Sequence, residues 1–423
     1  MKLYKYPAKS EWNELVKRPV MDVSSLEEKV SVILQEVKQQ GDVAVKQFTQ
    51  QFDKATVDNL LVTEEEFAAA QQALDAMLKA SILSAKVNIE TFHKAQLSEP
   101  QVIETMPGVL CWRKNVAIEK VGLYIPGGSA PLFSTVLMLG IPAKLAGCKD
   151  IIICTPPGSN GKVPDVILFA AKAVGITKVY KAGGVQAIAA MAYGTETIPA
   201  VSKIFGPGNQ YVTCAKQLVQ QHGVAIDMPA GPSEVAVYAD ASAKPAFVAA
   251  DLLSQAEHGA DSQVILVSTD ADFIQQVKKE VDKQTAALPR KDIARQALEN
   301  SKLVLAATEE EAINLLNAYA PEHLILSTDK AELLAEKVIN AGSVFLGHYS
   351  PESAGDYASG TNHALPTNGY ARAYSGVSVD SFVKKVTFQK LSNEGLRNIS
   401  KTVITMAEAE GLQAHANAVR IRL

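Results

Sequence analysis

Apolar residues follow a helical spacing in the early part of the chain. Between residues 24 and 95 they recur three or four positions apart. Ser24 or Ser25 can cap a helix over Leu26–Gln51, and Thr63, which three glutamates follow, can start another. The pattern therefore predicts an α-helical entry segment.

After Arg113, short apolar runs typical of β-strands alternate with longer helical runs. The first series of expected elements is Val116–Tyr124, Leu132–Ala146, Asp150–Thr155, Pro164–Val174, Lys178–Lys181, Gln186–Tyr193 and Lys203–Phe205. The second is Val235–Ala239, Lys244–His258, Gln263–Ser268, helices within 271–299, Leu303–Ala306, Glu309–Ala318, His323–Ser327, Lys330–Asn340 and Ser343–Leu346. Such alternation builds parallel sheets, so two α/β domains are expected, joined where Met228–Ser233 interrupts the pattern. An amphipathic helix is expected over Phe388–Glu410, before a short tail that contains His415.

Composition narrows the kind of ligand. A chain of 423 residues allows a sizeable core in two or three domains, and 47% hydrophobic with 20% charged residues is ordinary for a globular protein. The net charge of -4 gives no electrostatic reason to bind nucleic acid. A small or zwitterionic substrate fits this balance better.

The sequence indicates neither a targeting signal nor a reactive cysteine pair. Met1–Pro7 lacks the apolar core of a secretory signal, and the longest apolar stretch, Pro131–Gly147, contains Ser134 and Lys144, which argues against a membrane span. We therefore expect a cytoplasmic protein. The four cysteines are scattered without a C-x-x-C pair, so buried free thiols are expected.

Three glycine-rich loops stand where strands are expected to end, at Pro126–Ser129, Ala182–Gln186 and Phe205–Asn209. In open α/β sheets the carboxyl ends of the strands form the ligand crevice, where helix N-termini receive phosphates. The three loops together indicate a nucleotide site. None has the G-x-G-x-x-G fingerprint, and turn chemistry alone explains any single loop.

Several polar residues have the composition of a catalytic or metal site. Gln255 and His258 lie three positions apart, which would place both on one face of a helix. Glu322 and His323 precede an apolar run, so they point to opposite sides of a strand start and can serve two proton transfers; a solvated Glu-His pair is the alternative. His93, His222 and His348 have neighbours typical of helix surfaces and loops, and no role is assigned to them.

The stretch Ser350–His363 is small and polar, which suits a functional loop better than a core, although a surface loop is the alternative. Gln255, His258, Asp356 and a further histidine would supply nitrogen and oxygen ligands for a zinc-like ion, although glutamine is an uncommon ligand. His415 by itself looks like an exposed terminal histidine.

At these motifs the sequence resembles the histidinol dehydrogenase family over nearly its whole length. The segments that carry the resemblance are Val121–Leu132, Ile204–Asn209, Ile226–Glu234, Asp251–Gly259, Pro321–Leu324 and Ser350–His363. The resemblance implies oxidation of L-histidinol to L-histidine through the aldehyde, with two NAD⁺ and one zinc ion per subunit, as the last step of histidine biosynthesis. It also implies a homodimer with a shared site.

The resemblance carries roles over to individual residues. The zinc ligands would be Gln255, His258, Asp356 and, from the partner subunit, His415; Glu322 and His323 would be the catalytic pair. The implied substrate contacts are Ser233, Gln255, His258, His323, Asp356, His363, Glu410 and His415, and the implied NAD contacts are Tyr124, Gln186 and Asn209.

The fold implied by the resemblance is α/β, with two Rossmann-like parallel-sheet domains, similar to aldehyde dehydrogenases, plus small N- and C-terminal helical segments. The expected division is an arm at 1–20, a zinc and catalytic domain at 21–123 and 233–375, an NAD-binding domain at 124–232, and a tail at 376–423 that contributes to the partner's site.

Three other functions stay open at this point. A cysteine-dependent aldehyde dehydrogenase would use Cys154, which follows a strand, as its nucleophile. A zinc-dependent hydrolase and a non-catalytic metabolite-binding module are the others.

Overall fold

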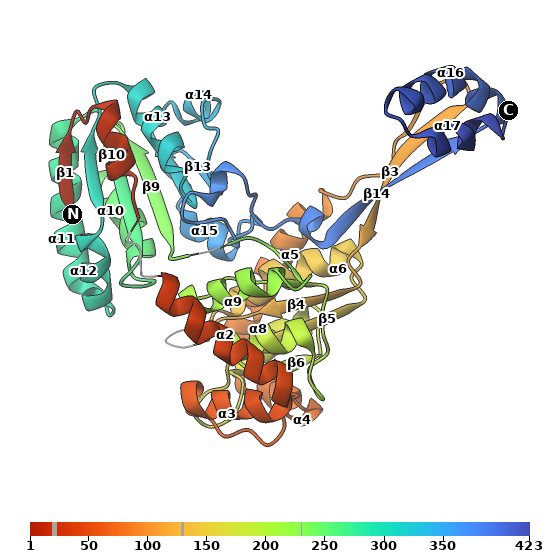
Figure 1. The fold of residues 1–423 in the computed structure, drawn as a ribbon. Helices are drawn as coiled ribbons and strands as arrows, with labels where there is room; N and C mark the ends of the chain where they lie inside the picture. The colour runs from red at the N-terminus through yellow and green to blue at the C-terminus, as the bar shows by residue number, and fades with distance from the viewer. Residues whose placement is uncertain (19–22, 128–130, 230) are drawn as a thin grey trace.

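The computed structural model describes the whole chain except residues 19–22, 128–130 and 230 (Figure 1). It contains two parallel sheets, each covered by helices, and an antiparallel ribbon that projects from them. The α/β class with parallel-sheet domains is therefore confirmed. The side chains of Ser24 and Ser25, as well as Gly128 and Ser129 of the first glycine loop, lie outside the described part.

The entry segment is helical, as expected. Its helices are α2 (Val23–Gln40), α3 (Asp42–Asp53), α4 (Glu64–Ala73) and α5 (Ala76–Lys94). The single helix expected up to Gln51 is broken at Gly41, whose φ is +54°. Thr63 caps α4 as expected: its hydroxyl accepts from the Glu66 amide at 3.3 Å, and the Glu66 carboxylate accepts from the Thr63 amide at 2.9 Å.

A five-stranded parallel sheet forms one unit, in the order β6-β5-β4-β7-β8. Its strands are β4 (Lys120–Tyr124), β5 (Asp150–Thr155), β6 (Val179–Lys181), β7 (Lys203–Phe205) and β8 (Ala225–Ile226). Its helices are α6 (Phe133–Ala146), α7 (Asp165–Ala173), α8 (Gly184–Tyr193) and α9 (Gln210–Gln220). Successive residues of β4 enter opposite cores, with Leu123 in one and Tyr124 in the other, as a sheet covered on both faces requires.

The entry helices cover this five-stranded unit. Helix α2 packs on α8 and α9, α4 packs on α7, and α5 packs on α6. This packing differs from the expected division, which grouped residues 21–123 with 233–375. The difference arises because the apolar faces of α2 to α5 are completed by the helices of the five-stranded sheet, a tertiary choice that the spacing of apolar residues does not encode.

A six-stranded parallel sheet forms the other unit, in the order β1-β11-β10-β9-β12-β13. Its strands are β1 (Lys2–Lys5), β9 (Glu234–Ala239), β10 (Gln263–Ser268), β11 (Lys302–Leu305), β12 (His323–Ser327) and β13 (Ser343–Leu346). Its helices are α10 (Pro245–Ala256), α11 (Ala271–Ala287), α12 (Lys291–Glu299), α13 (Glu309–Tyr319) and α14 (Ala331–Ala335). The N-terminal arm thus supplies an edge strand, followed by the short helix α1 (Trp12–Leu15).

The C-terminal segment leaves both units on a long ribbon (Figure 1). Strand β14 (Val383–Leu391) pairs with β3 (Val109–Ala117), which pairs with β2 (Val102–Met106). The expectation of one helix from Phe388 was therefore wrong at its start: Phe388 is in β14 and stacks on Trp112 at 5.4 Å, and α16 (Asn393–Ala409) begins only after the Ser392 cap. Helix α17 (Gln413–Arg420) packs on α16.

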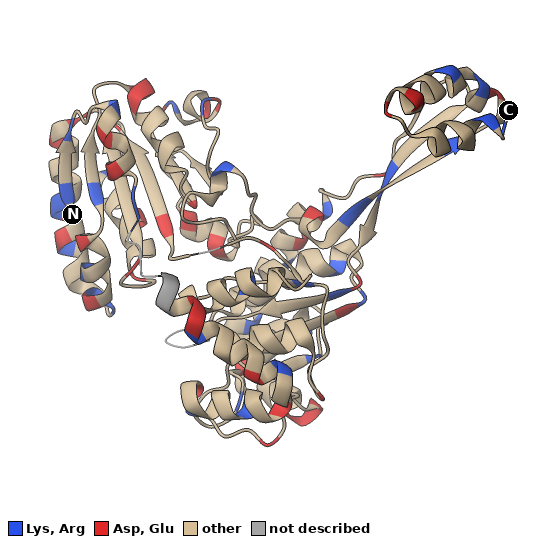
Figure 2. Ribbon diagram, viewed as in Figure 1, with Lys and Arg blue, Asp and Glu red and all other residues tan. Residues whose placement is uncertain are grey.

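Charged side chains of both signs are spread over both units (Figure 2), in keeping with the small net charge. Among the described helices, none combines the length and apolar character needed to cross a membrane.

Gly206, directly after β7, has a backbone conformation that only glycine adopts easily. Its φ is +124°, and a Cβ atom there would collide with the carbonyl oxygen of Tyr124. Gly223 has a φ of +89° but open space around it.

We predict that Gly206→Ala destabilises the protein by roughly 2–4 kcal/mol, and Gly223→Ala by about 1 kcal/mol. Thermal unfolding of both variants measures the difference, and equal losses would contradict this account.

Candidate functional site

Four segments converge at the amino edge of the six-stranded sheet. Strands β9 and β12 are parallel neighbours, with His323 opposite Val235, so both begin there. Helix α10 connects the parallel strands β9 and β10, so it returns along the sheet and ends near the same edge. Helix α15 (Glu352–Tyr357) packs against α10. The fold therefore gathers segments that lie about a hundred residues apart.

His323 is held by both ring nitrogens. The side chain is 2% exposed; Nδ1 donates to the Glu234 carbonyl at 3.1 Å, and Nε2 lies 3.3 Å from Oδ1 of Asp356. Since Nδ1 already has its acceptor, Nε2 is the atom that can exchange a proton. Desolvation lowers the pKa of the ring, but the carboxylates of Glu322 and Asp356 outweigh it and raise the pKa well above its usual value.

Glu322 is also held in place by the backbone of Glu234. Its Oε2 accepts from the Glu234 amide at 2.8 Å and lies 3.6 Å from Nδ1 of His323. Burial raises the pKa of the Glu322 carboxyl, against the opposing effect of His323. The main chain of Glu234 thus contacts both members of the pair.

The side chain of Glu234 is itself clamped. Arg18 donates from Nε and Nη2 to its two carboxylate oxygens, at 2.9 Å each, and the Asn368 amide donates at 3.0 Å. The Arg18 guanidinium also lies 3.7 Å from the ring centre of Tyr319. A bidentate pair of this kind fixes orientation as well as charge, so Arg18 orders the start of β9.

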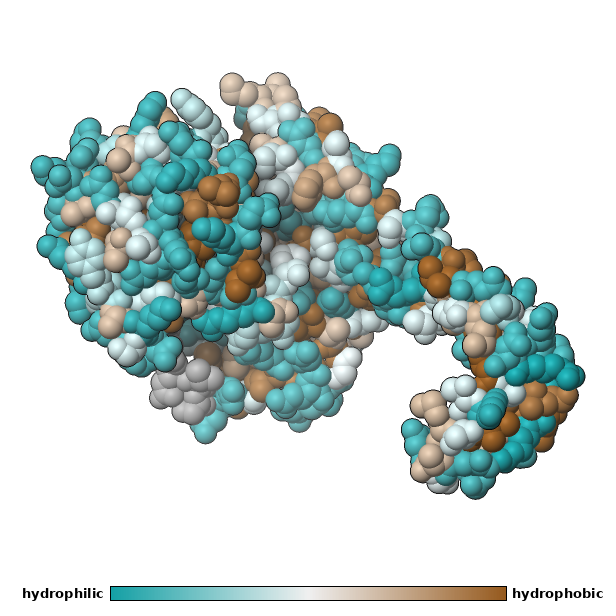
Figure 3. Space-filling model, turned by 90° about the horizontal axis from the view of Figure 1, so that it is seen from above, coloured by the Kyte–Doolittle hydropathy of each residue, from teal (hydrophilic) through white to brown (hydrophobic). Residues whose placement is uncertain are grey.

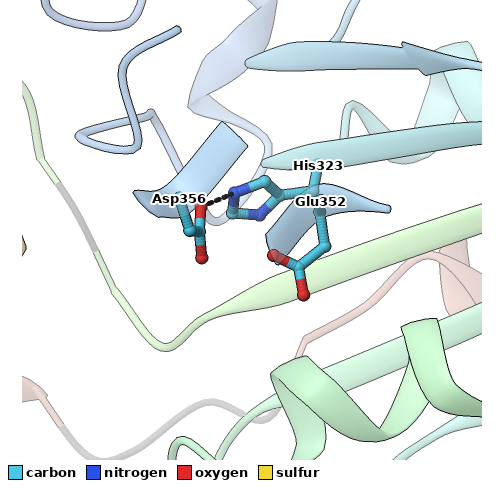
Figure 4. A group of neighbouring side chains, drawn as sticks. All are labelled: His323, Glu352 and Asp356. Carbon is cyan, nitrogen blue, oxygen red and sulfur yellow. Dashed lines mark hydrogen bonds and ion pairs between the residues drawn. The ribbon is translucent and has the colours of Figure 1, made fainter. Parts of the chain in front are cut away.

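Asp356 and Glu352 face the His323 ring from α15 (Figure 4). Desolvation alone would raise the pKa of Asp356, but the hydrogen bond from His323 lowers it to about 2. Glu352 is 1% exposed; its Oε1 accepts from the Ser254 hydroxyl, and its Oε2 has no hydrogen-bond partner. Burial raises the pKa of Glu352 to about 7, with a further contribution from Asp356.

The spacing of Gln255 and His258 suggested that they share a helix face, but the structure shows that they do not. Helix α10 ends at Ala256, so the buried Gln255 belongs to its last turn and His258 to the turn that follows. Burial lowers the pKa of the His258 ring, and the charge of Asp356 partly offsets this effect.

His363 links the site to the other unit. Its Nδ1 donates to the Asp356 carbonyl at 2.9 Å, and its Nε2 lies 3.1 Å from the hydroxyl of Thr135 on α6. Burial lowers the pKa of this ring. The preceding Asn362 binds His93, which is fully buried and not at a helix surface as its neighbours suggested.

The donor set at this edge fits a zinc-like cation. Among the described residues, potential ligand atoms of His323, Glu352 and Asp356 lie within 4.8 Å of one another. Nitrogen and carboxylate donors suit zinc. This trio shares only Asp356 with the expected set, so the structure supports a cation site here without testing that particular set.

Two expected residues lie far from this edge within one chain. Glu410 directly follows α16 and His415 lies on α17, and both are exposed on the projecting unit that carries these helices (Figure 1). Ser233, in contrast, directly precedes β9 and its carbonyl accepts from the Gln263 amide at 3.2 Å. The single chain therefore assembles part of the expected site.

The three expected NAD-contacting residues lie at the carboxyl edge of the five-stranded sheet. Tyr124 ends β4, and its hydroxyl accepts from the Gly184 amide at 3.1 Å. Gln186 is in the first turn of α8, and Asn209 caps α9 by accepting from the Tyr211 and Val212 amides at 3.1 Å. The described parts of the glycine loops thus lie at the edge that the sequence predicted.

Cys154 is not placed for nucleophilic catalysis. It is fully buried in β5, and burial raises the pKa of its thiol. A thiolate is the reactive form, so this environment argues against the cysteine-dependent alternative.

Arg18, Glu234 and Glu352 were given no role from the sequence alone. Glu234 and Glu352 stand within motifs that were singled out, so their position was a usable signal. Arg18 gave none, because 216 residues separate it from its partner.

The comparisons with known proteins agree along the whole chain. The family model described as histidinol dehydrogenase matches residues 16–423. The chain is 60% identical to a histidinol dehydrogenase of Bacteroides thetaiotaomicron over 423 residues, which is 100% of this chain and 99% of that protein. It is 54% identical to one from Xanthomonas campestris, over 96% of this chain and 95% of that one. The crystal structure of histidinol dehydrogenase from Elizabethkingia anophelis superposes with a TM-score of 0.98 at 55% identity, covering 100% of this chain and 98% of that one.

The clamp on Glu234 gives a stability prediction. We expect Arg18→Ala to cost roughly 3–5 kcal/mol, because it leaves a buried carboxylate unpaired. The neighbouring Lys17→Ala, at an exposed side chain, should change stability by less than about 0.5 kcal/mol. Thermal unfolding tests both variants. The double variant Arg18→Met/Glu234→Leu should recover part of the loss, whereas strictly additive losses would show that the pair is not coupled.

Proposed function

Because the chain belongs to the histidinol dehydrogenase family, we propose that it catalyses the NAD-dependent oxidation of L-histidinol to L-histidine through L-histidinaldehyde, the last step of histidine biosynthesis. The observation that carries the mechanism is the buried pair Glu322 and His323, both held by the main chain of Glu234. Two oxidations remove four electrons at one site. We expect the enzyme in the cytoplasm, where its cofactor is available.

His323 is the base in the first oxidation. The hydroxyl proton of histidinol leaves to Nε2 while the carbon gives up a hydride, which yields the aldehyde. Nδ1 stays bonded to the Glu234 carbonyl, which fixes the ring orientation, so this transfer falls to Nε2, the nitrogen that Asp356 faces at 3.3 Å. Tyr124, Gln186 and Asn209 would hold NAD⁺, which would supply the hydride acceptor for each oxidation.

Glu322 acts in the second oxidation. The aldehyde must add water before a second hydride can leave, and the Glu322 carboxylate takes the proton of that water. Burial supports this role, because a raised pKa makes the carboxylate a stronger base. Proton transfer of this kind contributes roughly 10²–10⁴ in rate.

Zinc, held by Gln255, His258, Asp356 and His415 of a second subunit, would orient the imidazole and amine of the substrate. Ser233, His363 and Glu410 complete the proposed substrate contacts. His363 lies beside the proposed zinc ligand Asp356, whose carbonyl it binds, and bonds Thr135 with its other nitrogen.

A homodimer accounts for the projecting C-terminal unit. Large apolar side chains are exposed on it, among them Ile421 at 71%, Met406 at 60% and Val102 at 55%. Brown residues on the projecting unit in Figure 3 mark such apolar positions. Contiguous exposed apolar surface is typical of protein interfaces, and a second subunit would also bring Glu410 and His415 to the site.

Counting product tests the function. We predict two NADH per L-histidinol, followed at 340 nm, and unchanged turnover in Cys154→Ala because that thiol is buried and unreactive. One NADH per substrate would indicate an alcohol dehydrogenase that stops at the aldehyde. Loss of turnover in a well-folded Cys154→Ala variant would support the cysteine-dependent aldehyde dehydrogenase instead. Hydrolysis or binding without NADH would point to the hydrolase or the binding module.

If Glu322 and His323 have separate roles, a substitution of one of them should affect the two oxidations differently. Glu322→Gln should slow oxidation of histidinaldehyde by roughly 10²-fold or more, and oxidation of histidinol to the aldehyde much less, because only the second half needs activated water. Each half is measured with its own substrate. Equal losses in the two halves would contradict the division of labour.

Shared sites predict complementation between subunits. His323→Asn and His415→Asn should each be inactive alone. After unfolding and refolding together in equal amounts, about a quarter of the sites combine an intact His323 with an intact His415 from the other chain. Recovery near this level supports the shared site. No recovery, with mixed dimers verified by mass, would rule it out.

A further inference from the structure

A cavity of about 350 Å³ lies beside the proposed NAD contacts, at the carboxyl edge of the five-stranded sheet. Its walls are mostly apolar, with Phe52 on one helix and Pro131, Pro156 and Pro164 on the loops. Asp53 is an ionisable group in this lining. A cavity of this size and character suits a flat aromatic group such as a purine.

Asp53 lies in this lining without a balancing charge. It is the last residue of α3 and is partly buried, and desolvation raises the pKa of its carboxyl to about 6. No cation forms an ion pair with it within the described part of the chain, and its hydrogen-bond donor is Nε2 of Gln186 at 3.4 Å. An acid in such surroundings has accepting capacity left for a ligand.

Gln186 carries a second unsatisfied group. The residue is 1% exposed, and its Oε1 has no hydrogen-bond partner although its Nε2 reaches Asp53. Buried amide oxygens are nearly always paired, so an orphaned one indicates that a partner is missing. The cavity, the acid in its wall and the orphaned amide bonded to that acid therefore lie together at one place.

The geometry points to Asp53 as the acceptor for the two hydroxyls of the adenosine ribose of NAD⁺, with the adenine in the cavity beside Phe52. One carboxylate accepts from both hydroxyls, and it repels the 2′-phosphate of NADP⁺. Asp53 thus determines cofactor specificity. This inference rests on the proposed NAD-dependent function.

The acid comes from an unusual place in the chain. In the common dinucleotide fold, a carboxylate about 20 residues beyond the glycine loop binds the ribose. Here α3 precedes the whole five-stranded sheet and reaches its edge by packing on α8. The helical entry segment therefore completes the cofactor site, which agrees with the absence of a G-x-G-x-x-G sequence.

Calorimetric titration at pH 8 with ADP-ribose and with 2′-phospho-ADP-ribose tests the inference without turnover. The wild-type enzyme should prefer ADP-ribose. Asp53→Asn should weaken ADP-ribose binding by about tenfold or more and narrow the preference over the 2′-phosphate form by a similar factor. Asp58→Asn, at an exposed acid on the same connection, is the matched control and should change neither value.

Two further measurements keep the outcome unambiguous. Asp53→Glu retains the charge, so it should keep discriminating against the 2′-phosphate even if ADP-ribose binds less tightly. An unchanged preference in Asp53→Asn, with thermal unfolding like the wild type, overturns the role of Asp53. If the wild type makes NADH from histidinol under the same conditions, the proposed function survives that result; if it neither binds ADP-ribose nor makes NADH, the proposed function itself fails.

Discussion

The bidentate ion pair between Arg18 and Glu234 is the contact on which the site depends. Glu234 makes three separate contacts. Its carboxylate accepts from Arg18, its backbone amide donates to Glu322, and its carbonyl accepts from His323. A single residue at the start of β9 thus sets the position of both groups for which we propose proton transfer. Because the pair is buried, its geometry is maintained by strong charge-assisted bonds instead of by loop packing.

The residues proposed to take part in the reaction lie at opposite ends of the strands in the two sheets. The proposed catalytic pair lies at the amino edge of the six-stranded sheet, whereas the expected cofactor residues lie at the carboxyl edge of the five-stranded one. The usual rule places ligands at carboxyl edges, and only the cofactor half obeys it. The amino edge becomes usable because α10 ends there and α15 packs on it, which adds polar groups from outside the sheet.

Local patterns predicted most of the elements. The alternation after Arg113 predicted the strands of both sheets apart from the edge strands β1 and β8, and Thr63 predicted the start of α4, because these features depend on neighbouring residues. Phe388 was assigned to a helix because its strand is recognisable only through pairing with β3. Likewise, the entry helices were grouped with the wrong sheet, since amphipathic spacing shows that a face is buried but not against what.

The site was predictable to the extent that it lies in contiguous motifs. Glu322, His323 and Asp356 stand in segments with unusual polarity, and the structure brings both carboxylates to the His323 ring. Arg18 and Asp53 could not be found in this way, because their partners are more than a hundred residues away and neither has distinctive neighbours. Long-range electrostatic partners become visible only when the chain is folded.

The separate cores of the two units have a consequence for how such an enzyme can change over time. The residues around the six-stranded sheet form clusters distinct from those around the five-stranded sheet. Substitutions that reshape the cofactor edge therefore leave the packing behind the proton-transferring pair intact. Nucleotide preference and chemistry can therefore be selected largely independently, because the two units have separate cores and are joined near the site by polar contacts such as that between His363 and Thr135.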